Sequence, residues 1–330
     1  MNRVDLTIAI PTYDGAKRLP KLLEKLQSQI NTESFTWEII VVDNNSMDST
    51  AQVVKKYQQD WSKQFPLKYQ LETKQGSAFA RQRAIEECHS EWIAFLDDDV
   101  IPVNDWVAAA YQFMQEHPYA GAFSSQIHGN FEIDPPQNFS KIQSFLAITE
   151  RGKEPNLYEA DKLIVPTTAA LVVNKKAWQE SLPKNPVFKG RIGKSMIGGE
   201  DFELMLHMHK KGWKIWYNPA MHAYHQIPRQ RLERDYLVAL SRSCGLCAYH
   251  LRSINIKSSQ KLLLMVRFWL GSDLRRAVKH FWQHRGTLKN DLVAECEMAF
   301  FWASWFSPCY FIYRTIQDNF KKKYNVTFIN

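Results

Sequence analysis

The sequence predicts an α/β fold with a mostly parallel central sheet, flanking helices and a C-terminal helical appendage. Three observations support this prediction. Short apolar or β-branched runs alternate with amphipathic helical stretches over the first hundred residues. Polar, largely acidic residues follow three of the predicted strands. Beyond Arg229 the pattern changes to long amphipathic stretches rich in Arg, Lys, Trp and Phe.

Composition indicates a globular protein with an uneven charge. Of the 330 residues, 45% are hydrophobic and 23% are charged, which excludes a disordered chain. Five scattered cysteines favour a reducing compartment, and the N-terminal residues show no secretory signal pattern, so we expect a cytoplasmic protein. Residues 1–230 hold 26 Lys and Arg against 27 Asp and Glu, a net of −1, whereas residues 231–330 hold 16 against 7, a net of +9. The basic character therefore belongs to the last third.

The first hundred residues read as repeated strand–helix units. Strands are predicted at residues 6–10, 37–42, 68–71 and 92–96, and helices at 18–30, 49–61 and 77–88. Helices of this length between strands imply βαβ units and a parallel sheet, in which ligands bind beyond the carboxyl ends of the strands. Residues 102–195 are less regular. Further strands are expected at 163–173 and 213–217, and a helix is expected at 202–211.

Three consecutive aspartates, Asp97, Asp98 and Asp99, close the fourth predicted strand. In extended backbone, residues i and i+2 point the same way, so Asp97 and Asp99 can face one cation while Asp98 turns aside. Mg²⁺ and Mn²⁺ prefer such oxygen ligands and are often shared with substrate phosphates. The alternative is an acidic loop that starts the next helix.

Two other loops offer ligand-binding groups. Asp43 comes directly after the second strand and can grip a base or ribose, whereas Asp48 and Ser49 fit helix capping. Gly76 opens a helix with small residues, and Arg81 lies on its next turn, with a solvated arginine as the alternative. Neither GxGxxG nor GxxxxGK[ST] occurs, so a dinucleotide fold or a P-loop lacks its signature.

A glycine-bearing loop that includes Gly190 and Gly193 leads to Glu200 and Asp201 at the start of the helix predicted at 202–211. Acidic residues are stabilising in a first helical turn, and a carboxylate there can also receive a proton from a hydroxyl. His222 and His225 follow the strand predicted at 213–217. Two histidines three residues apart do not make a zinc site without further partners.

These pieces, in this order, resemble the family 2 glycosyltransferases of the GT-A fold over roughly residues 5–235. Pro11-Thr12-Tyr13 resembles the opening nucleotide loop of that family, and Asp43-Asn44-Asn45-Ser46 its second loop. Asp97–Asp99 is similar to its DxD motif and Glu200-Asp201 to its ED motif, while His225 lies where relatives place a histidine near metal and diphosphate. Two positions depart from the family pattern. Asn44 stands where the family has a second aspartate, and Gln82 stands where an asparagine often follows the arginine.

The resemblance implies a metal-dependent, inverting transfer of a sugar from a nucleoside diphosphate to an acceptor hydroxyl. It makes Asp201, beside Glu200, the catalytic pair, with Asp201 as base, and gives a divalent cation, Mn²⁺ or Mg²⁺, to Asp97, Asp99 and His225. The nucleotide-sugar contacts it implies are Pro11, Thr12, Tyr13, Asp43, Gly76, Arg81, Asp97 and Asp98. The implied acceptor is a saccharide or a lipid-linked acceptor in bacterial surface or extracellular polysaccharide biosynthesis.

The same resemblance divides the chain into a catalytic domain over residues 1–235 and a basic, aromatic-rich helical region over 236–330. Within the first, residues 1–100 form the nucleotide-binding half and residues 101–235 the acceptor half. Two alternatives stay open: a non-catalytic sugar-nucleotide-binding protein, and a nucleotidyltransferase, although its glycine-rich N-terminal loop is lacking. A phosphatase with a DxD nucleophile fits less well, because Ile101 stands where a threonine is expected.

The basic last third has two interpretations. The run from Met298 to Tyr313 is mostly apolar, but its 16 residues fall short of the ~20 that span a bilayer. Basic, aromatic-rich helices can lie on an anionic membrane, or they can pack their aromatic residues against the catalytic domain. No recognisable RNA- or DNA-binding motif supports nucleic acid as the partner.

Overall fold

The computed structural model describes residues 4–61, 65–183, 186–188, 190, 196–256, 260–288 and 290–324. The chain forms two compact units. We call the first the sheet unit, which comprises Met1–Pro135, Leu146–Ser195 and Glu200–Arg229. We call the second the helical unit, which comprises Pro136–Phe145, Met196–Gly199 and Gln230–Asn330. The predicted domain division at residue 235 stays a prediction, because compactness alone does not define independent folding.

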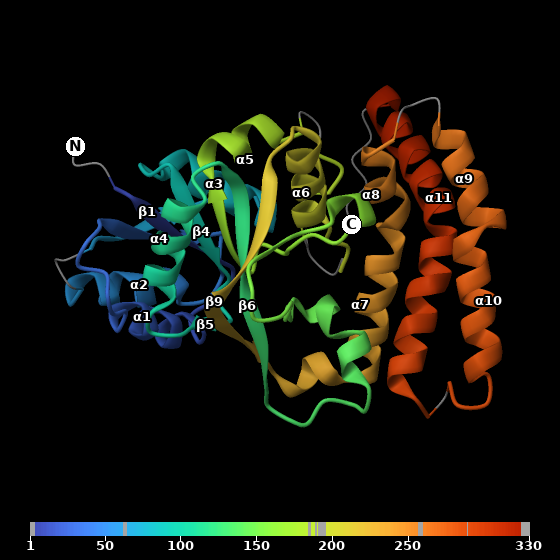
Figure 1. The fold of residues 1–330 in the computed structure, drawn as a ribbon, viewed down its shortest axis with the longest axis horizontal. Helices are drawn as coiled ribbons and strands as arrows, with labels where there is room; N and C mark the ends of the chain where they lie inside the picture. The colour runs from blue at the N-terminus through green and yellow to red at the C-terminus, as the bar shows by residue number, and fades with distance from the viewer. Residues whose placement is uncertain are drawn as a thin grey trace. The chain divides into compact units, whose positions relative to one another are not determined.

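The first half of the sheet unit has the predicted strand–helix alternation. In chain order its elements are β1 (Leu6–Thr12), α1 (Leu19–Gln27), β2 (Trp37–Asp43), α2 (Thr50–Gln59), β3 (Leu67–Leu71), α3 (Ser77–Glu87) and β4 (Trp92–Leu96). The four strands are parallel and lie in the order β3-β2-β1-β4. Because the chain changes direction across the sheet after β3, α1 and α2 lie on one face and α3 on the other (Figure 1).

The second half completes a mixed sheet in the order β3-β2-β1-β4-β8-β6-β9-β5, with β7 paired to β9. Its elements are β5 (Val100–Pro102), α4 (Trp106–Glu116), β6 (Ala120–Phe131), β7 (Asn156–Leu157), β8 (Ala170–Asn174), α5 (Lys175–Ser181), α6 (Glu200–Lys210) and β9 (Lys214–Ile227). Short 3₁₀ helices occur at Phe139–Lys141, Gln143–Leu146, Ala160–Lys162 and Arg229–Leu232. Strand β8 is antiparallel to both β4 and β6, whereas β6 and β9 are parallel.

Two predicted strands have different bounds in the structure. The strand expected at 163–173 begins only at Ala170, because Leu163 ends a 3₁₀ turn in the left-handed region at φ 61° and Pro166 has no N–H to donate. The strand expected at 213–217 continues as β9 to Ile227, so it includes both His222 and His225.

The core explains why these residues form these elements. Every residue of β2 is buried, as expected for a strand covered on both faces. Helix α1 buries Leu19, Leu22, Leu23 and Leu26, which recur at helical spacing on one face. The ends of β1, β2 and β4 are therefore fixed by a rigid, buried sheet.

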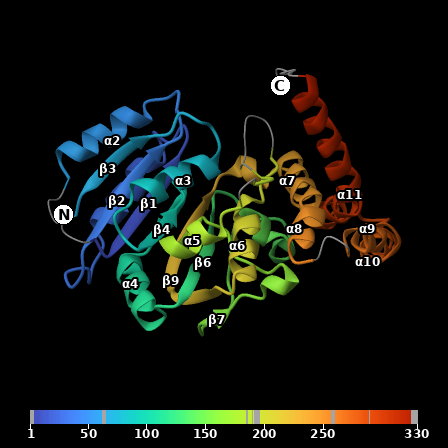
Figure 2. The same cartoon turned by 90° about the horizontal axis from the view of Figure 1, so that it is seen from above.

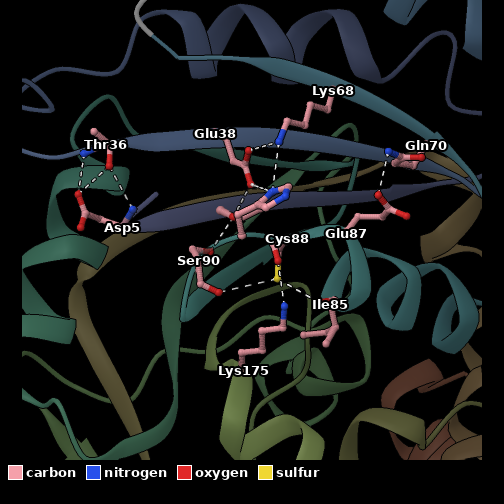
Figure 3. A network of polar contacts seen from close by, with 12 residues as sticks. Asp5, Thr36, Glu38, Lys68, Gln70, Ile85, Glu87, Cys88, Ser90 and Lys175 are labelled. Atoms are coloured by element: carbon pink, nitrogen blue, oxygen red, sulfur yellow. Dashed lines mark hydrogen bonds and ion pairs between the residues drawn. The ribbon is translucent and has the colours of Figure 1, made fainter. Parts of the chain in front are cut away.

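A buried polar network joins the strands at the opposite end from Asp43 (Figure 3). Glu38, the second residue of β2, has a side chain only 1% exposed. Its carboxylate accepts hydrogen bonds from Thr7 Oγ1 of β1 at 3.0 Å and from Lys68 Nζ of β3 at 2.5 Å. Ser90 Oγ donates to Thr7 Oγ1 at 2.7 Å and so extends the network to the loop before β4.

Removing the cation of this network should destabilise the protein. We expect Lys68→Met to lower the free energy of unfolding by about 1–3 kcal/mol, because the buried Glu38 carboxylate loses its charged donor. Urea denaturation measures the change, with Lys55→Met on the exposed side of α2 as the control, expected within about 0.5 kcal/mol of the parent. Equal stability of the two variants would show that Glu38 does not depend on Lys68.

The helical unit is built from α7 (Arg234–Leu246), α8 (Ala248–Ile254), α9 (Lys261–Leu270), α10 (Ser272–His284) and α11 (Leu292–Tyr324). Helix α11 packs along α7 (Figure 2), and Gly245 allows this close approach, because an added Cβ would lie 2.4 Å from the carbonyl oxygen of Phe300. Helix α11 contains Pro308. In the part of the chain that the structure describes, no helix is both long and apolar enough to cross a bilayer.

Candidate active site

The polar residues predicted at the strand ends lie at one edge of the sheet. Thr12 and Asp43 are register partners at the ends of β1 and β2. Asp43 is buried: its Oδ1 accepts from the Ser46 N–H at 2.9 Å, and its Oδ2 accepts from the Tyr69 hydroxyl at 2.8 Å. Burial and the adjacent Asp43 carboxylate raise the pKa of Tyr69 to about 12, so Tyr69 remains a hydrogen-bond donor at neutral pH. The sequence did not indicate that Tyr69 would contact Asp43.

Asn44 holds the loop that leads into α3. Its Nδ2 donates to the carbonyls of Glu72 and Lys74 at 3.2 and 2.8 Å, while its Oδ1 accepts from the Gly76 N–H at 2.7 Å. An ionised aspartate could not donate to these carbonyls, which gives a physical reason for asparagine here. Gly76 has φ 133°, a conformation that side chains rarely allow, and it directly precedes α3.

Asp98 is held within the protein by a two-pronged contact with Arg18. Arg18 Nε and Nη2 donate to its two oxygens at 2.7 and 2.9 Å, and Thr12 Oγ1 donates to its Oδ2. Arg18 Nη2 also donates to the carbonyl of Tyr13, whose side chain is exposed. Asp98 thus fixes the loop that begins after Pro11, at the end of β1. The sequence did not indicate this role, because Arg18 lies 80 residues away.

Arg81 gathers three carboxylates. It donates to Asp97 Oδ1 at 3.0 Å, to Asp201 Oδ1 at 3.2 Å and to Glu200 Oε1 at 3.5 Å, and its side chain is 7% exposed. Burial alone would lower the pKa of Arg81, but the negative charges of Asp201, Asp97 and Glu200 outweigh it and raise that pKa. Residues about 120 positions apart in sequence therefore meet at one buried cation.

Glu200 and Asp201 are fixed from a second side. Ser77 Oγ, on the first turn of α3, donates to Glu200 Oε1 at 2.6 Å, and the Thr168 N–H donates to Asp201 Oδ2 at 3.0 Å. Burial, followed by the charge of Asp201, raises the pKa of Glu200, and Arg81 opposes the rise. Both carboxylates begin helix α6, where the helix N-terminus favours negative charge.

The glycine-bearing loop before α6 is only partly described. Gly190 has φ 84°, and a Cβ there would lie 2.1 Å from Ser77 Oγ and 3.1 Å from Glu200 Oε1. The loop backbone therefore lies against these two side chains, where only glycine fits. Gly193 lies outside the described residues.

Asp99 lies beside His225. His225 Nδ1 is 2.7 Å from the carbonyl oxygen of Leu146, which can only accept, so Nδ1 carries the proton and donates. Nε2 then faces Asp99 Oδ2 at 3.4 Å, with both side chains largely buried. His222 points to the other face of β9, where its Nδ1 lies 3.0 Å from His128 Nε2.

Asp97 interacts both with the cluster around Arg81 and with Asp99, the neighbour of His225. Burial raises the pKa of Asp97, the charges of Asp99 and Asp201 add to the rise, and Arg81 opposes it. The structure thus brings Asp97, Asp99, Glu200, Asp201, Arg81 and His225 together, while Thr12, Asp43 and Asp98 brace the neighbouring loops. Within the described ranges, no three His, Cys, Asp or Glu side chains are already arranged to hold a metal ion.

Comparisons with known proteins identify the family of this chain. The model of the family described as "Glycosyl transferase family 2" matches residues 7–177. An uncharacterised glycosyltransferase of Bacillus subtilis, YfnE, is 28% identical over 163 residues, which are 47% of this chain and 40% of that protein. The poly(ribitol-phosphate) beta-N-acetylglucosaminyltransferase TarS of Staphylococcus aureus is 30% identical over 112 residues, 34% of this chain and 19% of that protein.

The fold is also similar to a solved structure, the mannosyltransferase PcManGT of Pyrobaculum calidifontis in complex with GDP-Man and Mn²⁺. The TM-score is 0.59 at 15% sequence identity, and the match covers 92% of this chain and 86% of that one. This likeness confirms the predicted GT-A fold. The sequence matches span less than half the length of the two curated relatives.

Proposed function

Because the chain belongs to the glycosyl transferase family 2, we propose that it transfers a sugar from a nucleoside diphosphate to an acceptor hydroxyl with inversion at the anomeric carbon. One observation carries this proposal: Asp97, Glu200 and Asp201 come from two distant parts of the chain and meet around Arg81, beyond the end of β4. One of these carboxylates could then accept a proton, and the acidic side chains beside it could bind a cation.

The nucleotide end of the donor would lie against the loops after β1 and β2. The Tyr13 side chain, 45% exposed, is available to stack on the base. Thr12, Asp43 and Asp98 keep these loops in place through the buried hydrogen bonds described above, and Gly76 lets the diphosphate approach the backbone at the start of α3. In this arrangement the chain orients the donor before reaction.

We propose that the cofactor is a divalent cation, Mn²⁺ or Mg²⁺. The Nδ1–H of His225 is bound to a backbone carbonyl, which is how metal-ligating histidines are commonly oriented, and its Nε2 faces Asp99. Asp97, Asp99 and His225 would hold the cation. When bound, it supplies positive charge to the departing diphosphate. The Mn²⁺ of PcManGT supports the choice of ion.

Asp201 would act as the base. As the acceptor oxygen bonds to the anomeric carbon, its proton passes to the Asp201 carboxylate, and the bond from that carbon to the diphosphate oxygen breaks with the electron pair leaving on the diphosphate. Arg81 and the Thr168 N–H hold the Asp201 carboxylate in a fixed orientation before transfer. Glu200, held by Ser77, keeps its neighbour in place.

For the acceptor we propose a saccharide or a lipid-linked acceptor of bacterial surface polysaccharide biosynthesis. The support comes from two relatives, the poly(ribitol-phosphate) beta-N-acetylglucosaminyltransferase TarS and TuaG of Bacillus subtilis, a putative teichuronic acid biosynthesis glycosyltransferase. We further propose that the protein works in the cytoplasm. The support is the five scattered cysteines of the sequence, a pattern typical of a reducing compartment.

The reaction can be tested with the full chain and a panel of UDP-, GDP- and dTDP-sugars in the presence of Mn²⁺. We expect one donor to be consumed with release of its nucleoside diphosphate, EDTA to reduce that release to background, and excess Mn²⁺ or Mg²⁺ to restore it. Turnover that EDTA leaves unchanged would rule out the cation. Donor binding without turnover would favour the sugar-nucleotide-binding alternative, and release of pyrophosphate from a sugar phosphate and a nucleotide would favour a nucleotidyltransferase.

A further inference from the structure

Helix α11 carries an apolar stripe that faces outward. Trp302, Phe306, Tyr313 and Ile316 recur at intervals of four, seven and three residues, so they share one helix face, and their exposed fractions lie between 40% and 61%. The opposite face packs in the helical unit: Ser307 Oγ donates to the Leu246 carbonyl, and Phe311 contacts the Tyr249 ring. The exposed stripe is therefore additional to the face that stabilises the unit.

The helices before α11 show the same excess of exposed apolar surface. On α10, Val278, Phe281 and Trp282 are 40–60% exposed, whereas Ala277 and His280 are buried. On α9, Leu262 and Leu263 are about 70% exposed, on the side away from the buried Leu264 and Phe268. An exposed apolar residue by itself is ordinary, but aligned aromatic stripes on neighbouring helices indicate an interaction surface.

The stripes of α10 and α11 face the same side. The two helices are antiparallel neighbours, joined where His280 Nε2 meets the Ala294 carbonyl at 2.8 Å and where the His280 and Phe301 rings lie 5.4 Å apart. At about 100° per residue, the α10 stripe lies about 150° round its helix from this joining face, and the α11 stripe about 95° round its own, in the same rotational sense. Rotations in the same sense on antiparallel helices point to the same side, so the two stripes form one surface.

This surface has a positive rim. Residues 260–290 contain seven Lys and Arg and one acidic residue, Asp273. Asp273 is buried and paired with Arg252 at 2.6 Å, so its charge is compensated inside the unit. On α10, the exposed Arg275 and Lys279 lie beside the apolar stripe, and the Arg285 guanidinium lies 4.6 Å from the centre of the Trp282 ring.

We propose that this surface docks on a membrane that contains anionic phospholipids. We define it as Val278, Phe281 and Trp282 of α10 with Trp302, Phe306, Tyr313 and Ile316 of α11. Aromatic and aliphatic side chains enter the headgroup boundary, while long basic side chains at the rim reach lipid phosphates. A second copy of the chain fits less well, because pairing two such surfaces would bring their cations together.

Flotation of the full chain with lipid vesicles, without any sugar donor, tests this proposal independently of the transfer reaction. We expect the protein to float with phosphatidylcholine vesicles that contain phosphatidylglycerol, to remain below with pure phosphatidylcholine, and to bind more weakly as NaCl rises. Phe281→Ser with Trp282→Ser, and Trp302→Ser with Phe306→Ser, should each lower binding by about tenfold or more. Arg275→Glu with Lys279→Glu should have an effect of similar size.

Matched variants in the sheet unit control for non-specific effects. Tyr119→Ser removes an aromatic side chain that is 88% exposed, and Lys55→Glu with Lys56→Glu makes the same change of charge on exposed α2; both should bind like the parent. Circular dichroism checks that each variant is folded. The proposal fails if the parent does not float with anionic vesicles, if surface and control variants bind alike, or if light scattering shows a dimer that Trp282→Ser dissociates.

Discussion

Replacing Asp201 by asparagine should lower turnover by about 10²–10⁴-fold, because a general base contributes on that scale and an amide cannot accept the acceptor proton. Donor affinity should change little, since the nucleotide loops after β1 and β2 do not contact this side chain. Initial rates with saturating donor give turnover, and calorimetry with the donor gives affinity. The important result is a fall in turnover without a fall in donor affinity, because a misfolded site would lose both.

Two comparisons sharpen this test. Asp161→Asn removes a carboxylate whose side chain is 83% exposed and should leave turnover unchanged. Glu200→Gln removes the neighbouring charge but retains an oxygen that can accept from Ser77, so it should retain clearly more turnover than Asp201→Asn. If Asp201→Asn turns over at the parent rate, Asp201 is not the base. If Glu200→Gln loses more than Asp201→Asn does, the roles of the two carboxylates are reversed.

Much of the sheet edge could be predicted because it depends on local rules. Short apolar runs separated by amphipathic helices imply parallel strands, and the ends of parallel strands share an edge, which singled out Asp43 and the three aspartates at 97–99. The prediction that Asp98 turns aside from Asp97 and Asp99 holds, since it points to Arg18, but the assumed extended backbone was wrong. Strand β4 ends at Leu96, and residues 97–100 form a turn in which the Val100 N–H donates to the Asp97 carbonyl at 2.9 Å.

Contacts between distant residues could not be predicted from spacing. Nothing in the sequence connects Arg18 with Asp98 or Tyr69 with Asp43, because each pair forms only when the sheet is assembled. Helix α4 could have been predicted, because its apolar residues recur at helical spacing. The buried ones are Trp106, Val107, Ala110, Phe113 and Met114. Strand β6 mixes small and polar residues without clear alternation, which left residues 120–131 unassigned.

Arg81 should be the residue on which the stability of the whole site depends. Its removal leaves the carboxylates of Asp97, Glu200 and Asp201 close together, largely out of water, without the cation they share. Breaking a buried ion pair by deleting one partner costs about 3–5 kcal/mol. We therefore expect Arg81→Met to lower the free energy of unfolding by about that amount and to abolish turnover.

The same helix supplies a matched control. Arg83 lies two residues further along α3 and pairs with Glu87 at 2.9 Å, but its side chain is 36% exposed. Because exposed helical pairs contribute little, Arg83→Met should cost about 0.5 kcal/mol or less in urea denaturation. Equal losses for the two variants would mean that the carboxylates tolerate one another without Arg81.

Arg81→Lys separates charge from geometry. Lysine restores a positive charge on the same turn of α3, but an ammonium group cannot reproduce the planar fork that reaches Asp97 through one nitrogen and Asp201 through another. Stability should therefore recover in part while turnover stays low, because the base and the cation-binding carboxylates are no longer held at a fixed separation. Full recovery of turnover by lysine would show that Arg81 supplies charge alone, and that other contacts set the distance between Asp97 and Asp201.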